Sequence, residues 1–351
     1  MNFASDNTAP MAPQIIAALT RVNDGFANAY GGDACTARVE EAMAKFFDHE
    51  VAVFLVPTGT AANALSLAHI TPSWGGVLCH DIAHIKNDEC GAPEFFGNGI
   101  KLYGLLGDNG KLTPQAVQTA ITRHGNHRPH HVEAASLSIT QATEAGTIYR
   151  TDEIAALSQV AHAHDLPVHM DGARLGNALA RMNVAPADVT WKAGIDVLSF
   201  GATKAGAMAA EAVVFFDRTR AAGMAQRRKR SGQLISKHRF VAAQFEAYLQ
   251  DDCWLRLSRH ANDKADRLAE GLRRAGCTIV WAVEANIVFA VLPQALDASL
   301  RAAGASYYAR NAAMVGDEVT IAPDQMLVRM VTSFATQDDE IDRFVDLVRR
   351  G

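Results

Sequence analysis

The chain has 351 residues, of which 49% are hydrophobic and 20% are charged, a composition typical of a globular protein rather than a disordered one. The formal net charge of −5 at pH 7 argues against nucleic acid as the main partner, and no apolar run approaches the roughly 18 residues that a membrane-spanning helix needs. The length suits one large and one small domain, and the first residues lack the basic and apolar segments of a signal peptide, which predicts a cytoplasmic protein.

Residues 1–13 are polar and contain proline, which predicts an extended N-terminal arm. From 14 to 240 the sequence predicts a large domain that opens with two helices, at 14–29 and about 35–48, and then alternates strands with helices. The predicted strands are short and mostly apolar, and they fall at 51–56, 76–80, 100–103, 134–140, 166–170, 195–198 and 211–216. This alternation predicts an α/β fold with a large, doubly wound, mostly parallel sheet.

The pattern changes near residue 241, and residues 241–351 predict a small C-terminal α+β domain. A long helical region over about 240–276 carries the chain away from the sheet. The elements predicted after it are strands at 277–280, 286–292 and 326–332 and helices at 294–303 and 337–350.

Small and polar residues follow the first predicted strand, and ligands of doubly wound sheets bind outside the carboxyl ends of strands. Thr58, Gly59 and Thr60 lie between that strand and a helix predicted over 61–69. Free N–H groups and the positive end of the helix dipole favour a phosphate there. The lysine of a nucleotide-binding P-loop is missing, so that class of site is excluded. The alternative is an ordinary N-cap by Thr58 or Thr60.

An aspartate and a lysine follow two later strands of the predicted sheet. Asp171 ends the strand at 166–170, and Lys204 lies among small residues after the strand at 195–198. Pyridoxal phosphate needs such a pair, because a lysine amine forms the Schiff base with its aldehyde and an aspartate keeps its pyridine nitrogen protonated. Each residue alone has an ordinary alternative, a turn for the aspartate and a surface loop for the lysine. Together with the phosphate site, they predict pyridoxal phosphate as the cofactor.

Two arginines and a histidine are candidates for the same edge of the sheet. Arg329 interrupts an otherwise apolar predicted strand, and a buried arginine needs an anionic partner, either a substrate carboxylate or a structural ion pair. Arg174 follows Asp171 closely and is a second candidate for binding a carboxylate bidentately. His84 follows the strand at 76–80 and either stacks on a flat cofactor ring or lies on the surface.

Neither the cysteines nor the histidines predict a metal site. The five cysteines are odd in number and scattered, without the spacing of metal ligands, which predicts reduced thiols. The run from His124 to His131 is rich in histidine, but it holds no cysteine or carboxylate at ligand spacing. The basic run 227–230, with 237–239 beyond it, is either a solvated helix face or a counter-charge to a phosphate, including one bound to a neighbouring subunit.

The candidate residues stand in a series of short motifs, Ser5-Asp6-Asn7, Tyr30-Gly31-Gly32-Asp33, Thr58-Gly59-Thr60-Ala61-Ala62-Asn63, Ala83-His84, Asp171-Gly172-Ala173-Arg174-Leu175-Gly176-Asn177-Ala178, Ser199–Lys204 and Arg329-Met330-Val331-Thr332-Ser333. In this order they resemble the L-threonine aldolases, most closely the bacterial low-specificity and phenylserine aldolase branch. The resemblance covers nearly the whole chain. It implies pyridoxal-phosphate fold type I, the fold of the aspartate aminotransferase superfamily.

The resemblance implies how the cofactor is held. Lys204 forms the Schiff base, and Asp171 binds the pyridine nitrogen. His84 stacks on the ring and helps to deprotonate the substrate β-hydroxyl, directly or through water. The remaining cofactor-binding positions are Gly59 and Thr60 at the phosphate, with Arg174, Ser199 and Thr203.

The resemblance also implies how the substrate is held and how the chain assembles. The substrate carboxylate is bound by Ser5, Arg174 and Arg329. Tyr30 comes from the neighbouring subunit, because such sites resemble those shared in a homodimer or homotetramer. A second family histidine near the substrate hydroxyl matches His130 or His131, and the sequence leaves that choice open. The segment Ser231–Arg239 departs from the family's glycine-rich run with one arginine, so the basic residue that contacts the phosphate is also open.

The implied reaction is reversible cleavage of β-hydroxy-α-amino acids, such as L-threonine, L-allo-threonine or L-phenylserine, into glycine and an aldehyde. The first alternative is another reaction of the same fold, namely β-elimination, racemisation or transamination, because a fold does not decide the reaction. The second alternative is a binding or regulatory protein without catalysis. The presence of Lys204, Asp171 and Arg329 argues against it.

Overall fold

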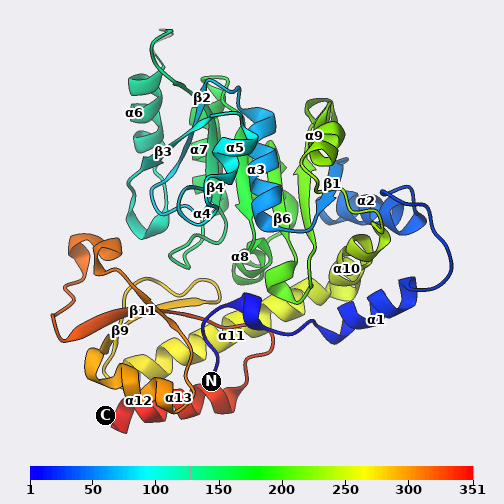
Figure 1. Ribbon diagram of the computed structural model, residues 1–351. Coiled ribbons are helices and arrows are strands. Elements are labelled where there is room, and N and C mark those ends of the chain that lie inside the picture. Colours follow the sequence, from blue (N-terminus) through cyan, green and yellow to red (C-terminus); the bar gives the residue numbers. More distant parts are fainter. Residues whose placement is uncertain (126–128, 351) are drawn as a thin grey trace.

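The computed structural model describes residues 1–125 and 129–350, and its larger part is built on a seven-stranded sheet (Figure 1). The strands are β1 (Ala52–Val56), β2 (Gly75–His80), β3 (Lys101–Leu105), β4 (Glu133–Thr140), β5 (Val168–Gly172), β6 (Val197–Gly201) and β7 (Glu211–Phe215). Their order is β1-β7-β6-β5-β4-β2-β3. β7 is antiparallel to both neighbours, and the other neighbouring strands are parallel. The predicted mostly parallel sheet is therefore confirmed.

Helices cover both faces of this sheet. Successive residues of a strand point to opposite faces, so each strand contributes side chains to a core on either side. Leu198 and Phe200 of β6 belong to one hydrophobic core, and Val197 belongs to another. The first core takes in helices α1 (Pro13–Val22), α2 (Ala34–Phe46), α6 (Pro114–His124), α7 (Thr151–His162), α8 (Leu175–Met182) and α10 (Arg239–Leu249). The opposite face carries α3 (Gly59–Ile70), α4 (His84–Asn87), α5 (Ala92–Phe96) and α9 (Met224–Arg230). Every residue from Ala61 to Ala68 of α3 is buried, so this helix is a central element of the fold.

The C-terminal part contains an antiparallel four-stranded sheet with the order β10-β11-β9-β8. Its strands are β8 (Thr278–Ile279), β9 (Ile287–Pro293), β10 (Tyr308–Arg310) and β11 (Gln325–Val331), and its helices are α11 (Cys253–Arg274), α12 (Asp297–Ala302) and α13 (Asp338–Arg350). The long helix α11 (yellow in Figure 1) packs against α8 of the larger part and against β9 of the smaller sheet. None of the described helices has the length and apolarity needed to cross a membrane.

Several elements differ from the sequence prediction, and the helical region predicted over about 240–276 is two helices, α10 and α11. Helix α1 ends at Val22 rather than at 29, because Asn23 caps it and Gly25 adopts a left-handed conformation with φ +58°. Strand β10 was not predicted, because it is only three residues long, is largely exposed and has no apolar pattern. Its pairing with β11 places Tyr308 opposite Arg329.

The N-terminal arm is tied into the C-terminal core rather than free. Phe3 is fully buried, and its ring packs edge-to-face on Phe344 with centroids 5.3 Å apart. The backbone N–H of Phe3 donates to Ser306, and its carbonyl accepts from Val331. The arm therefore has a fixed path, which carries Ser5 and Asp6 towards the larger sheet.

Replacing Phe3 with alanine is expected to lower the free energy of unfolding by about 3–5 kcal/mol, because the substitution leaves a cavity in this core. Urea denaturation followed by circular dichroism measures the change. Phe26→Ala is the control, since Phe26 is fully exposed and a surface substitution changes stability by about 0.5 kcal/mol or less. Equal effects of the two substitutions would show that the arm is not part of the folded core.

Candidate active site

The carboxyl ends of β1, β5 and β6 surround a cavity of about 500 Å³. Asp171 lies near the end of β5, and Lys204 lies in the 3₁₀ turn Thr203–Ala205 that follows β6. The structure brings together at this cavity the side chains or backbone of Gly59, Thr60, His84, Asp171, Thr203 and Lys204. A parallel sheet places successive strand ends at one edge, and residues far apart in the sequence therefore meet here.

Asp171 is buried and has a partner for each carboxylate oxygen. Oδ1 accepts from the Ala173 N–H at 3.0 Å, and Oδ2 accepts from Asn63 Nδ2 at 2.8 Å. Burial opposes ionisation, but the positive charges of Lys204 and His84 outweigh it and hold the pKa of this carboxyl below its usual range. Asp171 is therefore a fixed negative charge, as a partner of a protonated pyridine nitrogen requires.

His169, two residues before Asp171 on β5, is held by a buried polar network. His169 lies between Ser138 and Ser199, with Nδ1 2.9 Å from one hydroxyl and Nε2 2.9 Å from the other. Burial lowers the pKa of His169 to about 4, so the imidazole is neutral. The Ser199 hydroxyl is thus committed to His169, and it lines neither cavity described here. The structure does not bring Ser199 to the cofactor position that the family resemblance implied.

Helix α3 points its N-terminus at the cavity. Thr58 is its N-cap and accepts from the Ala61 N–H at 3.1 Å. Gly59 and Thr60 form the first turn, where backbone N–H groups have no partner within the helix. Thr58 is therefore the N-cap, while Gly59 and Thr60 leave N–H groups of the kind that bind an anion, and their binding of the phosphate stays a prediction.

His84 is the first residue of α4 and is held from two sides. Its Nδ1 lies 2.8 Å from Glu89 Oε1, and its backbone N–H donates to Glu144 Oε1 at 2.7 Å. Burial alone lowers the pKa of His84, but the hydrogen bond to Glu89 and the charge of Asp171 outweigh it, so the pKa is raised. The imidazole is more than a third exposed, with a relative side-chain accessibility of 38%, and it faces the cavity.

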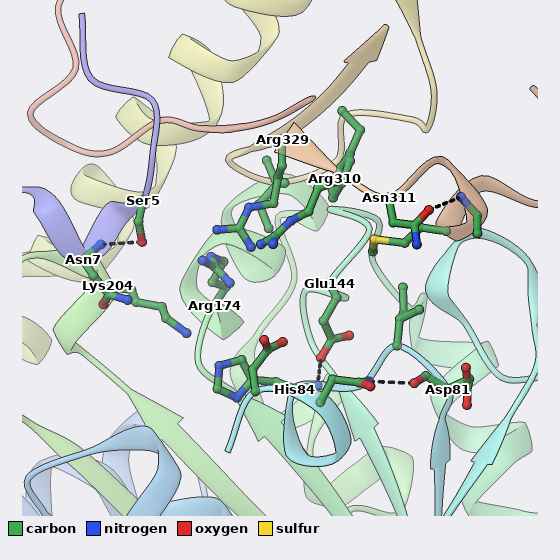
Figure 2. A pocket seen from close by; sticks show the side chains of 17 residues that line it. Ser5, Asn7, Asp81, His84, Glu144, Arg174, Lys204, Arg310, Asn311 and Arg329 are labelled. Carbon is green, nitrogen blue, oxygen red and sulfur yellow. Dashed lines mark hydrogen bonds between the residues drawn. The ribbon is translucent and has the colours of Figure 1, made fainter. Parts of the chain in front are cut away.

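A second cavity of about 460 Å³ adjoins the first and shares His84 and Lys204 with it (Figure 2). Ser5, Arg174 and Arg329, the residues predicted to bind the substrate carboxylate, also line it. Arg174 is already paired, because Nε and Nη2 donate to the two oxygens of buried Asp6 at 2.8 and 3.0 Å.

Arg329 lacks such an anion. Its guanidinium carbon lies 5.6 Å from the centroid of the Tyr308 ring, and its Nε is buried without a hydrogen-bond partner. Burial, together with the positive charges of Arg174 and Arg310, lowers the pKa of Arg329 to about 10. Among the residues that the structure describes, no carboxylate forms an ion pair with it. The structural ion pair considered from the sequence is therefore not what holds Arg329.

Besides Ser199, three predicted residues are not brought to these cavities within one chain. Tyr30 is half exposed and lines a separate small cavity with Arg228 and His238. His130 and His131 are exposed in the turn before β4, at the amino end of that strand. Within one chain this edge lies opposite to the one that carries Lys204, because the amino and carboxyl ends of a strand lie at opposite edges of the sheet, and the role of either histidine stays a prediction. Residues 126–128 of the histidine-rich run lie outside the described part of the chain.

Sequence reasoning missed several buried polar residues of the site. Asn63 links two carboxylates, since its Nδ2 lies 2.8 Å from both Asp171 Oδ2 and Glu89 Oε1. Asp6 and Glu144 also line or support the second cavity. Glu144 had a positional signal, because it follows β4 at the same edge as Asp171 and Lys204. Asp6 had none beyond the motif Ser5-Asp6-Asn7.

Comparison with known proteins agrees with this geometry. Residues 2–295 match the family model described as beta-eliminating lyase. The chain is 44% identical to the low specificity L-threonine aldolase of Pseudomonas aeruginosa and 42% identical to that of another Pseudomonas species, in each case over 87% of this chain and 88% of the relative. The solved structure of threonine aldolase from Leishmania major superposes with a TM-score of 0.91 at 27% identity, covering 99% of this chain and 98% of that one.

The chain therefore belongs to the beta-eliminating lyase family, within its threonine aldolases. It is an aldehyde-lyase, and its cofactor is pyridoxal phosphate, as the sequence predicted. The residues present fit that cofactor. A buried carboxylate, a lysine and a helix N-terminus lie around one cavity.

Proposed function

We propose that the enzyme cleaves the Cα–Cβ bond of L-threonine, L-allo-threonine and L-phenylserine-type amino acids, releasing glycine and an aldehyde, and that the reaction is reversible. The observation that carries this proposal is the unpaired guanidinium of Arg329, which lies in the same cavity as Lys204 and His84. A free amino acid brings the carboxylate that this cation lacks. The relatives named low specificity L-threonine aldolase support the same reaction.

The residues of the chain orient the substrate around the cofactor. Bound pyridoxal phosphate supplies the electron sink for the pair released at Cα. Arg329, with Ser5 and the remaining Nη1 of Arg174, would hold the carboxylate and thereby fix the orientation of the Cα–Cβ bond. Such fixing of the reacting bond is catalysis by orientation. Asp171 keeps a negative charge in the first cavity, and Lys204, which lines both cavities, would anchor the cofactor.

The wall of the second cavity suits more than one aldehyde. Ile287, Phe289 and Met314 provide apolar surface, and Asp81 and Asn87 provide polar surface. A cavity of about 460 Å³ has room for a methyl or a phenyl group on Cβ. We therefore propose that the enzyme accepts both aliphatic and aromatic substrates.

The test is to incubate the holoenzyme with L-threonine and to quantify acetaldehyde and glycine against 2-oxobutanoate and ammonia. Equal amounts of acetaldehyde and glycine are the expected products, and L-allo-threonine and L-phenylserine are tested in the same way. Release of ammonia instead would move the function to β-elimination. Formation of D-allo-threonine, the product of inversion at Cα, would move it to racemisation, and a keto acid formed with transfer of the amino group would move it to transamination.

Arg329→Ala is expected to raise KM for L-threonine by roughly 10- to 100-fold, because a charged hydrogen bond to the carboxylate is worth about 1.5–3 kcal/mol. Arg329→Lys retains the charge but not the bidentate geometry, so its KM is expected to lie between those of the wild type and Arg329→Ala. Steady-state kinetics measures both. Arg343→Ala, on the exposed face of α13, is the control. An unchanged KM in Arg329→Ala would remove this residue from the substrate site.

We also propose that two copies of the chain share their active sites. Tyr30, Arg228 and His238 form a separate cavity, in which Arg228 Nε and His238 Nδ1 are buried without partners. Because these residues do not reach the Lys204 cavity of their own chain, they serve it only from a neighbouring one. Sedimentation equilibrium of the holoenzyme tests the assembly, and a monomer at all concentrations would exclude it.

A further inference from the structure

Glu144 lies in the second cavity, and neither the sequence nor the comparisons assign it a role. It follows β4 and comes from the segment after Thr140, at the carboxyl edge of the sheet. In Figure 2 its carboxyl group stands beside His84 and across the cavity from the arginines. It is thus close to His84, the histidine expected to stack on the cofactor ring.

The two oxygens of Glu144 have unequal surroundings. Oε1 accepts from the His84 N–H at 2.7 Å and from Thr140 Oγ1 at 3.1 Å. Oε2 is buried and has no hydrogen-bond partner, which is uncommon for a native carboxyl. The last torsion of a glutamate is broad, so a small rotation turns Oε2 towards a ligand in the cavity. The geometry therefore leaves one oxygen free to take a proton.

Charged and titratable groups face Glu144 from five elements. They are His84 on α4, Asp171 on β5, Arg174 at the start of α8, Cys79 on β2 and Tyr149 in the segment after β4. Burial, opposed by the hydrogen bond from the His84 N–H and reinforced by the charge of Asp171, raises the pKa of Glu144 to about 7. A general base works best when its pKa lies near the working pH.

His84 is less suited to this task. Its Nδ1 is bound to Glu89, and its raised pKa keeps it protonated to a higher pH than a free histidine. A protonated imidazole cannot accept a proton. His84 can still stack on the cofactor ring, which requires only its flat face.

We propose that the Glu144 carboxylate is the catalytic base that accepts the proton of the substrate β-hydroxyl. As the Cα–Cβ bond breaks, the O–H pair forms the carbonyl bond of the aldehyde. The proton goes to Oε2, and the pair of the Cα–Cβ bond is left to the electron sink that the bound cofactor would supply, until a proton from water adds at Cα and completes glycine. The carboxylic acid then returns its proton to water once the aldehyde has left, and in the reverse reaction it protonates the new alkoxide. This inference rests on the proposed aldol cleavage.

Glu144→Gln tests it, because glutamine keeps the acceptor at Oε1 and replaces Oε2 by a group that cannot accept a proton. Three quantities are measured on the holoenzyme. These are the kcat for acetaldehyde release from L-threonine, the exchange of the glycine α-hydrogen in D2O by NMR, and the glycine dissociation constant read from cofactor absorbance. Glycine has no β-hydroxyl, so its binding and exchange do not need the proposed base.

Cleavage is expected to fall by roughly 10²- to 10⁴-fold in Glu144→Gln, while glycine exchange and glycine binding stay at the wild-type level. In the wild type, kcat/KM for cleavage is expected to rise with pH through about 7 as Glu144 ionises, and the variant loses that limb. Glu94→Gln is the matched control, because Glu94 also has a buried, unpartnered Oε2 but lies outside both cavities.

The outcomes separate the inference from the function on which it rests. Cleavage by Glu144→Gln at the wild-type rate would overturn the role of Glu144 and leave the proposed function intact. Equal loss of cleavage, glycine exchange and glycine binding would also overturn it, because Glu144 would then act on the cofactor site or the fold. A wild-type enzyme that exchanges glycine but cleaves no β-hydroxy amino acid would overturn both.

Discussion

Replacing Lys204 with alanine is expected to abolish the absorbance of the lysine-bound cofactor at roughly 400–430 nm. It is also expected to lower kcat by about 10⁴-fold or more. Lys204 lies in the cavity lined by Asp171 and the start of α3, and no described residue forms a hydrogen bond or an ion pair with its amine. The amine is therefore free to react with the cofactor aldehyde. Absorbance spectra and acetaldehyde assays of the purified variant measure the two effects.

Lys192→Ala is the control for Lys204→Ala, because Lys192 is an exposed lysine that contacts the nearby Asp188 and the ring of Trp191 and lines neither active-site cavity. It is expected to keep both the absorbance and the activity. Circular dichroism of both variants shows whether the fold is retained. If Lys204→Ala retained the absorbance of the wild type, the covalent anchor would have to be another lysine.

Replacing Asp171 with asparagine is expected to lower kcat by roughly 10²- to 10³-fold, the cost of losing one preorganised electrostatic partner. The variant retains an oxygen for the Ala173 N–H but turns an NH2 group towards the NH2 group of Asn63. It also removes the negative charge that we propose keeps the pyridine nitrogen protonated. Both kcat and the pH dependence of the cofactor absorbance are measured.

Asp188→Asn is the control for this substitution. It also removes one negative charge, but from a carboxylate at the surface. The variant Asp171→Glu keeps the charge and is expected to recover part of the activity. If Asp171→Asn had wild-type kcat, the negative charge would have no part in the reaction, and Asp171 would serve only to hold Asn63.

The predictions that depend on local pattern agree with the structure. The alternation of apolar strands with helices placed all seven strands of the large sheet, because a strand buried on both faces is short, apolar and bounded by turns. The same alternation predicted that Thr58, Asp171 and Lys204 lie at one edge of the sheet. Boundaries were less accurate. Helix α1 ended early at Asn23, where capping and a left-handed glycine outweigh helical spacing.

The predictions that depend on pairing across the molecule were less complete. Arg174 was assigned to a substrate carboxylate, yet it is held by Asp6, which lies 168 residues away in the sequence. His130 and His131 were candidates for the substrate hydroxyl, yet they precede β4 and lie at its amino end. Glu144 follows the same strand and lies at the carboxyl end with Lys204. A difference of a few residues thus decides which edge of the sheet a side chain reaches.

The sequence alone determined the α/β class and the cofactor, and it placed Asp171 and Lys204 at one edge of the sheet, because strand periodicity and the order of the strand ends can be inferred from neighbouring residues. Only the tertiary structure decided which charges are already neutralised and which are left for a substrate. It paired Arg174 with Asp6, left Arg329 without an anion, and placed Glu144 beside His84. These outcomes depend on how the N-terminal arm, β4 and β11 pack against one another, and such packing is not a property of any single segment.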